Sequence, residues 1–176
     1  MKMFTRAAVV CAVLMFAGAV FAQTSTEPYG TVEIERFGIA QGVEFPENDL
    51  NELMSYMVTH FNRSRRFQNV FLSSDAASGT AEPRRAKIVG TVSKYAKGSR
   101  AARYLIGLGA GRTKLVADVK VVDAETGDVL FEQKVDGHVY GGFFGGQTDA
   151  AKSGLASEII KTMTKKGYAR KERIKS

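Results

Sequence analysis

The chain has 176 residues, of which 44% are apolar and 24% charged, and a formal net charge of +7. Its one cysteine, Cys11, lies in an N-terminal apolar run, so the rest of the chain has no disulfide, no thiolate nucleophile and no cysteine metal site. What remains after that run is the right size for one domain with a single core.

The first 22 residues have the pattern of a secretory signal peptide. Lys2 and Arg6 give a positive start, residues 7–20 are apolar and uncharged, and residues 20–22 match a small-x-small cleavage pattern. We therefore predict cleavage after Ala22 and export to the periplasm, with a peripheral association with the outer membrane compatible with that location. The apolar run is too short for a good spanning helix, so an uncleaved anchor is the less favoured alternative.

Cys11 does not have the small residue before it that a lipoprotein signal requires, and the apolar run continues past it. Removal of the signal takes away two basic residues and no acids, which lowers the formal charge from +7 to +5. Seven basic residues crowd into residues 161–176. In an exported protein they favour anionic lipid headgroups or cell-wall polymers over nucleic acid, and a solvated helix end is the alternative.

The mature chain begins with a polar stretch that predicts a flexible leader over residues 23–30. A strand is predicted over residues 31–39, because Val32 and Ile34 share one face. Phe37 and Ile39 fall on the other face, so we expect a β-bulge near Glu35 or Arg36.

The clearest helix is predicted over residues 49–65. Asp49, followed three residues later by Glu52, resembles a capping box, and a short buried strand is predicted to follow at residues 70–72. The apolar residues of the helix recur at helical spacing: Leu50, Leu53, Met54, Met57, Val58 and Phe61.

Three more strands and a helix complete the chain. A strand is predicted over residues 85–96, and the next two form a hairpin around the turn at residues 124–127. Matching the apolar faces of the hairpin pairs Val119 with Phe131. The same matching sets Val121 opposite Val129 and Leu115 opposite Val135.

The last helix is capped by Thr148 or Asp149 and stops at Gly167. The predicted fold is α+β: a two-layer sandwich with an antiparallel or mixed sheet of about five strands and two helices on one face. The order is strand, helix, four strands, helix. A single domain covers residues 31–166, and residues 167–176 form a basic C-terminal tail.

Two glycine-rich segments flank the predicted hairpin in the sequence, one before its first strand and one after its second strand. Extending the hairpin away from its turn places Gly111 near Val139, Gly109 near Gly141 and Gly107 near Phe143. We therefore predict that the segments meet at one end of the molecule. There they would form an apolar and aromatic surface with a basic rim, or simply allow close packing with the aromatic rings turned inward. The candidate binding residues are Arg100, Arg103, Tyr104, Gly107, Gly109, Gly111, Arg112, Tyr140, Phe143 and Phe144.

These glycines do not match a nucleotide-binding motif. Arg112 occupies the third-glycine position of the dinucleotide fingerprint, and a strand rather than a helix follows it. Residues 104–111 are too few to span a bilayer as a helix. Shallow insertion into a membrane surface, or packing on the apolar surface of another protein, remains open.

No catalytic or metal-binding pattern is present, so we predict no catalytic residue, no metal and no cofactor. His60 lies next to the apolar stripe of its helix and His138 on the polar face of its strand, without a triad or a second ligand at metal spacing. A hydrolase of envelope polymers that uses a pair of carboxylates brought together in space is the alternative.

Residues 98–146 carry a family resemblance. Gly98-Ser99-Arg100, then Arg103-Tyr104, the glycines at 107, 109 and 111, and the stretch Asp123-x-x-Thr126-Gly127-x-Val129-Leu130 resemble the family called domain of unknown function 4410. The resemblance implies an exported bacterial envelope protein and no particular chemistry. Together with the residues above, it favours a non-enzymatic binding or assembly module. Its expected partner is an envelope protein, a cell-wall polymer or a membrane surface.

Overall fold

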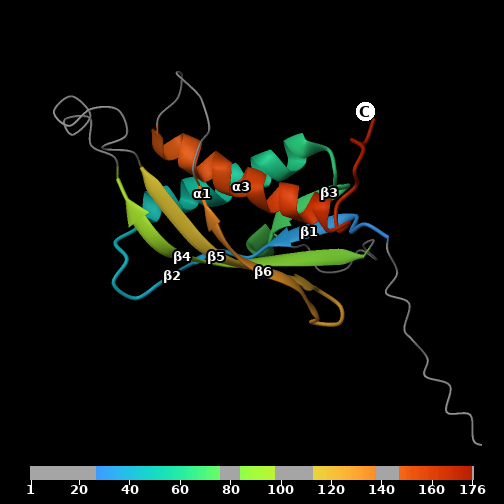
Figure 1. Cartoon of the computed structure of the whole chain (residues 1–176), viewed down its shortest axis with the longest axis horizontal. Coiled ribbons are helices and arrows are strands. Elements are labelled where there is room, and N and C mark those ends of the chain that lie inside the picture. Colours follow the sequence, from blue (N-terminus) through green and yellow to red (C-terminus); the bar gives the residue numbers. More distant parts are fainter. Residues whose placement is uncertain (1–26, 76–83, 98–112, 138–146, 176) are drawn as a thin grey trace, which may run out of the picture.

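Six strands form one mixed sheet, and two long helices cover one of its faces (Figure 1). The computed structural model describes residues 27–75, 84–97, 113–137 and 147–175. The two-layer α+β fold is thus confirmed. Its elements are β1 (Thr31–Ile34), β2 (Gly38–Ile39), α1 (Glu47–Ser64), β3 (Asn69–Leu72), the short 3-10 turn η1 (Ser73–Asp75), β4 (Arg85–Ala96), β5 (Lys114–Asp123), β6 (Val129–Asp136) and α3 (Gln147–Lys165).

The sheet is parallel in one half and antiparallel in the other. Its order is β3-β1-β4-β5-β6, with β2 also pairing with β4. Strand β1 runs parallel to both β3 and β4, and α1 supplies the crossover that a parallel β1–β3 pair needs. The pairs β4–β5 and β5–β6 are antiparallel. Strand β3, expected to be buried, is instead the half-buried edge of the sheet.

The expected bulge separates β1 from β2. Ile34 pairs with Ile88 and Gly38 pairs with Thr91, so the residues between β1 and β2 contain one more residue than the facing part of β4. Phe37 turns into the core across this break and is 2% exposed. A Cβ atom on Gly90 would lie 2.4 Å from the Phe37 ring, so β4 needs glycine at this position.

The predicted hairpin register is wrong by two residues. Val119 pairs with Gln133, and Phe131 pairs with Val121. Next to the turn, which has Gly127 at φ +77°, a bulge shifts the pairing by one residue. Because a shift of two leaves every side chain on its original face, matching the apolar faces could not separate the two registers.

The charges on the outer face do separate the two registers. Lys120 lies 2.8 Å from Glu132, and Lys134 lies 3.1 Å from Asp118, so each cation faces an acid on the neighbouring strand. The predicted register would have set Asp118 opposite Glu132 and Lys120 opposite Leu130. Opposite charges directly across two strands stabilise the pair, and like charges destabilise it.

Helix α1 follows Pro46 and ends at Arg65, which adopts the left-handed conformation with φ 53°. The predicted range was therefore right within two residues, but the expected capping box is absent. No side chain caps the first turn, and Asp49 and Glu52 instead bind Lys152 of α3. Their spacing serves a contact between two helices and not a local cap.

Helix α3 begins at Gln147, so Thr148 and Asp149 lie in its first turn and not before it. Its C-terminal end is as predicted, with Gly167 at φ +83°. The two helices run in the same direction, as Figure 1 shows. Their buried faces cover the sheet with Leu50, Leu53, Met54, Met57 and Phe61 from α1 and Leu155, Ile159 and Met163 from α3.

The described end of the chain folds back as a strap, residues 168–175, which we call the C-terminal strap. Tyr168 stacks on Phe131, and its carbonyl accepts a hydrogen bond of 3.0 Å from the N–H of Tyr29. Further along, the N–H of Ile174 donates to the carbonyl of Arg65 at 2.7 Å. The strap therefore joins the start of the described chain to the C-terminal end of α1.

Candidate functional site

The ten predicted binding residues lie outside the described residues, in the segments 98–112 and 138–146. This holds for Arg100, Arg103, Tyr104, Gly107, Gly109, Gly111, Arg112, Tyr140, Phe143 and Phe144. Their grouping into one surface therefore stays a prediction. What can be described is the set of residues from which these two segments leave the fold.

Those flanking residues lie together at one end of the sandwich. Ala96, the last residue of β4, pairs with Lys114, the first residue of β5. The N–H of Gly137, just after β6, donates to the carbonyl of Leu115 at 2.8 Å. We call this the loop-bearing end, and the first turns of both helices lie over it (Figure 1).

Gly137 is tightly enclosed at this end. A Cβ atom built there would lie 2.2 Å from the carbonyl oxygen of Ala151 in α3 and 3.3 Å from that of Leu115. Backbone atoms cannot turn away as a flexible side chain can. For Gly137, therefore, the interpretation that glycine allows close backbone packing is correct.

A fully buried lysine joins the two helices beside these flanking residues. Lys152 of α3 is 0% exposed, and its Nζ lies 2.8 Å from Asp49 Oδ1 and 2.5 Å from Glu52 Oε2. The hydroxyl of Tyr95, near the end of β4, donates to the other Asp49 oxygen at 3.1 Å. The four side chains thus link both helices to the strand that leads into residues 98–112.

Lys152 and Asp49 both stay charged at neutral pH. Burial disfavours the charged amine, but hydrogen bonds to Asp49 and Glu52 outweigh it and raise the pKa of Lys152. Burial likewise opposes ionisation of Asp49, and the hydrogen bonds from Lys152 and Tyr95 nevertheless lower its pKa. A catalytic lysine needs a lowered pKa, so this group holds the helices together and does not supply a nucleophile.

The sequence did contain a sign of this buried lysine. Lys152 falls on the same helical stripe as Leu155, Ile159 and Met163, all of which are buried. A single charge on an apolar stripe indicates a buried partner, and the acids at Asp49 and Glu52 were available on the other helix.

The D-x-x-T-G stretch builds the hairpin turn at the opposite end of the sheet. Asp123 Oδ1 accepts hydrogen bonds from the N–H groups of Glu125 at 2.9 Å and Thr126 at 3.2 Å. Its Oδ2 accepts one from the hydroxyl of Tyr29 at 2.8 Å and lies 3.2 Å from Arg84 Nη2. Burial opposes ionisation of Asp123, but these donors together lower its pKa. The motif is therefore a turn anchored in the core.

His60 lies in the C-terminal part of α1, beside the C-terminal part of α3, and His138 is outside the described residues. Burial and the nearby charge of Arg63 lower the pKa of His60. Across the described ranges, no three side chains of the metal-binding types come together as a metal site. Nor does any described helix have the length and apolar character needed to cross a bilayer.

The domain is of the α+β class. Two parallel helices cover one face of its mixed sheet, and a buried lysine joins the two helices through ion pairs. The chain belongs to the family described as domain of unknown function 4410, whose model matches residues 23–144. The matched range includes both glycine-rich segments almost to their ends and the Asp123 turn. A comparison with curated proteins gave no match.

Solved structures share this fold at low identity. A dodecamer of a PelC variant from Paraburkholderia phytofirmans is 13% identical, with a TM-score of 0.54 over 82% of this chain and 91% of that one. Protein XCC0632 from Xanthomonas campestris, of the family DUF330, is 11% identical, with a TM-score of 0.50 over 80% and 88%. At these identities the likeness concerns the fold alone.

Proposed function

We propose that this chain is a non-enzymatic module of the bacterial cell envelope that binds or assembles through its loop-bearing end. The proposed contact surface is the set of ten residues in the two glycine-rich segments. Arginine and aromatic side chains are the types that dominate binding hot spots, because they bury large areas at a modest entropy cost. The partner would be an envelope protein, a cell-wall polymer or a membrane surface.

The observation that carries this proposal is the convergence of the flanking residues. Both segments leave the fold beside the Ala96–Lys114 pair and the Gly137–Leu115 hydrogen bond. The buried Lys152 and the enclosed Gly137 show that the described residues of this end are closely packed. A contact surface carried by rigid elements loses less entropy on binding than one carried by a mobile frame.

The charges of the described residues also favour binding over hydrolysis. A carboxylate pair for glycoside hydrolysis needs one acid with a raised pKa beside a second acid in an open cleft. Asp49 and Asp123 instead have lowered pKa values and are engaged by Lys152 and Arg84. The hydrolase alternative would need acids that none of these contacts supplies.

Self-assembly is one form that the proposed contact can take. The PelC structure of the same fold is described as a dodecamer. If the partner is a second copy of this chain, light scattering after size exclusion will give a mass that is a multiple of the monomer mass. If the partner is another envelope component, the purified chain will remain monomeric.

Site-directed photo-crosslinking in the native envelope tests the proposal. A photoreactive amino acid placed at Phe143 should give specific crosslinked products. The same amino acid at Val129, which is 52% exposed at the far end of the hairpin, should give none. Equal crosslinking from both positions, or none from Phe143, would contradict the proposed surface.

A stability measurement separates this surface from the packing alternative. Phe143→Ser together with Phe144→Ser should abolish the crosslinks made from a photoreactive amino acid placed at Tyr140, while the urea midpoint stays nearly unchanged. If the two rings fill the core, each truncation will cost about 3–5 kcal/mol and the unfolding transition will drop sharply.

A further inference from the structure

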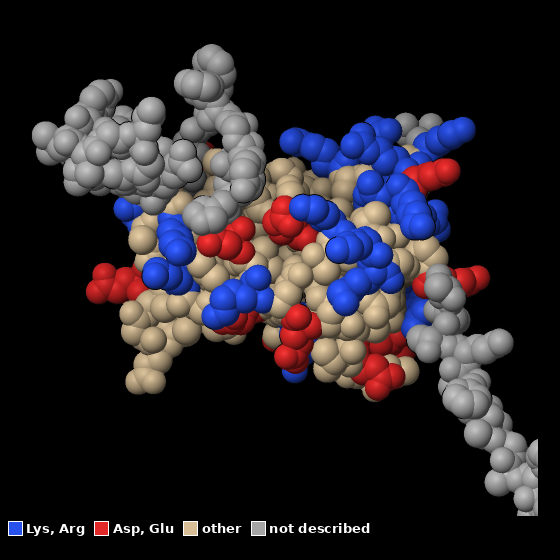
Figure 2. All heavy atoms as spheres, in the orientation of Figure 1, with Lys and Arg blue, Asp and Glu red and all other residues tan. Residues whose placement is uncertain are grey.

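A groove among the described residues lies at the other end of the helix pair. It is an open groove of about 530 Å³ between the C-terminal halves of α1 and α3, with the C-terminal strap beside it. We call it the basic groove, and its ionisable lining is His60, Arg63, Arg66, Lys161, Lys165 and Arg173. Figure 2 shows lysine and arginine side chains gathered over this end of the molecule.

The basic groove has no acid among its described lining residues. Glu158 pairs with Lys161 at 3.2 Å, and Arg66 donates to the carbonyls of Arg170 and Lys171 in the strap. Within the described part of the chain, Arg63, Lys165 and Arg173 make no ion pair. Several cations without matching acids create a positive potential that attracts an anion.

The hydroxyl groups of the groove do not contribute donors. Ser64 donates to the carbonyl of Phe61 at 2.6 Å, Ser157 to that of Ser153 at 2.9 Å, and Thr164 to that of Ile160 at 2.7 Å. A ligand would therefore meet the guanidinium and ammonium groups, with Ile160 as the apolar part of the lining. Guanidinium groups match the geometry of phosphate oxygens, and a phosphate carries enough charge to engage more than one cation.

We propose that the basic groove binds a phosphate-bearing anion between α1, α3 and the C-terminal strap. The same chemistry is offered by a soluble organic phosphate and by the headgroup of an anionic phospholipid. This site is separate from the loop-bearing end, so it does not depend on the contact proposed there. His60 lies in the groove, which makes its ring a reporter of binding.

Histidine NMR tests the proposal, with the His60 signal identified by comparison with His60→Gln. Glycerol 3-phosphate is titrated into the purified protein at low ionic strength, where screening is weak. A bound phosphate should raise the pKa of His60, because a nearby anion stabilises the imidazolium form. The second probe is sedimentation with vesicles of phosphatidylglycerol and phosphatidylcholine in equal parts, compared with phosphatidylcholine alone.

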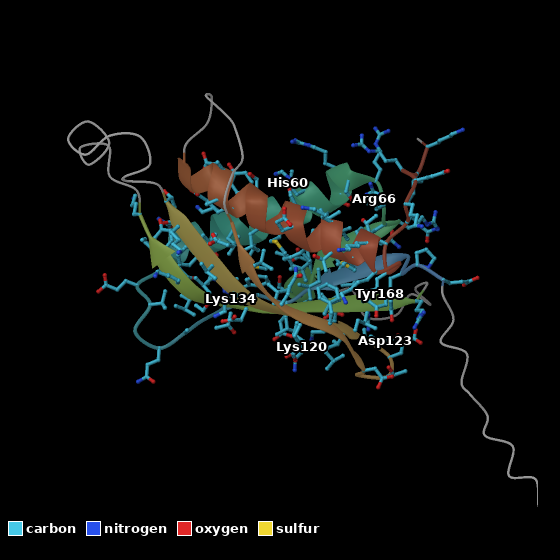
Figure 3. All side chains as sticks on the ribbon, viewed as in Figure 1. His60, Arg66, Lys120, Asp123, Lys134 and Tyr168 are labelled. Atoms are coloured by element: carbon cyan, nitrogen blue, oxygen red, sulfur yellow. The ribbon has the colours of Figure 1, made fainter. Side chains whose placement is uncertain are left out.

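The variant Arg63→Ala/Lys165→Ala removes two exposed cations from the groove. Its matched control, Lys120→Ala/Lys134→Ala, removes the same charge from the sheet face turned away from the helices, as Figure 3 shows. The groove variant should weaken binding of the effective probe by about tenfold or more, because each lost cation removes a charge-assisted contact. The control should bind within about twofold of the wild type, since distant charges are largely screened.

The two probes identify the source of the phosphate. Binding of glycerol 3-phosphate indicates a soluble ligand, and binding only to phosphatidylglycerol vesicles indicates a lipid headgroup. Loss of binding to the same degree in the groove variant and the control would reduce the effect to net charge and overturn the site. Absence of binding to every probe would overturn it as well.

Discussion

The two ends of the parallel helix pair differ in whether their cationic side chains have acidic partners. At the loop-bearing end, Lys152, the one fully buried cation of the described residues, is shared by two acids and enclosed by protein. At the C-terminal end, the basic groove gathers cations without acids among its described lining residues. The first end compensates its own charges, whereas the second leaves charge available for a ligand.

The helix dipoles explain why the charges separate in this way. Parallel helices place two partial positive charges at one end and two partial negative charges at the other. Acids accordingly occupy the first turns, at Glu47, Asp49 and Asp149, and basic residues occupy the last turns, at Arg63 and Lys165. An antiparallel pair would have mixed the two kinds of end and cancelled much of this polarity.

The largest expected effect comes from removing the buried cation. Lys152→Met leaves the Asp49 carboxylate without its main partner and should lower the free energy of unfolding by about 3 kcal/mol. At the other end, Lys161→Met should change it by less than about 0.5 kcal/mol, because an exposed ion pair contributes little. Urea unfolding of both variants measures the difference. Equal losses would mean that the two ends are not distinct.

Gly137→Ala tests how tightly the loop-bearing end is packed. The new methyl group must displace backbone atoms of α3, which should cost about 2 kcal/mol. Gly38→Ala is the matched control, since its Cβ would meet nothing closer than 3.6 Å. The same urea titrations apply to this pair. A loss of similar size in the control would show that general strand propensity, and not the contact with Ala151, sets the cost.

The two ends should also respond in different pH ranges. The lowered pKa of Asp49 contributes stability above its unfolded value, about 3.9, that is lost as the pH falls through the lower folded value. The stability difference between wild type and Asp49→Asn should therefore shrink below about pH 4. Urea midpoints measured from acid to neutral pH test this, and a constant difference would contradict it.

At the other end the sensitive group is His60. Its pKa is lowered in the folded chain, so the unfolded chain binds the proton first as the pH falls below about 6.5. The free energy of unfolding of the wild type should therefore decline as the pH falls through that range. In His60→Gln the decline should be smaller, and the same urea midpoints measure it. A profile identical to that of the wild type would remove His60 as the cause.

The smallest expected effect is at the end of α1. Arg65→Gly relieves the left-handed conformation at φ 53° and should raise the free energy of unfolding by about 0.5 kcal/mol. Arg63→Gly, two residues earlier in the last helical turn, should lower it by up to about 1 kcal/mol. Thermal unfolding resolves the opposite signs, and two changes of the same sign would contradict the conformational argument.

Local patterns predicted most of the fold, and pairings between distant residues were missed. The helical spacing in α1 and the alternation in β4 gave their ranges closely, because each depends on neighbours in sequence. The hairpin register was missed because apolar faces repeat every two residues, although the charges at Asp118 and Lys134 distinguished the alternatives. The cap expected at Asp49 was replaced by a contact with a lysine 103 residues away, which no local rule includes.

For the candidate site, the ten binding residues are a prediction from the sequence, and the structure describes only the residues that flank their two segments. Glycine-rich segments carry little periodicity, so their arrangement could not be derived beyond an extended register. The buried position of Lys152 was recognisable from its helical stripe. The sequence indicated the basic groove only through the concentration of basic residues in 161–176, because α1 and the C-terminal strap complete the groove from distant parts of the chain.

The hydrogen bond between Tyr29 and Tyr168 has a consequence for the order of folding. It joins the beginning of the described chain to a residue close to its end. The centre of the sheet also cannot form until β1 pairs with β4, which comes later in the chain. Contacts between such distant residues slow folding, since the intervening chain must be ordered first. The native structure therefore cannot be completed before residues 168–175 have been synthesised.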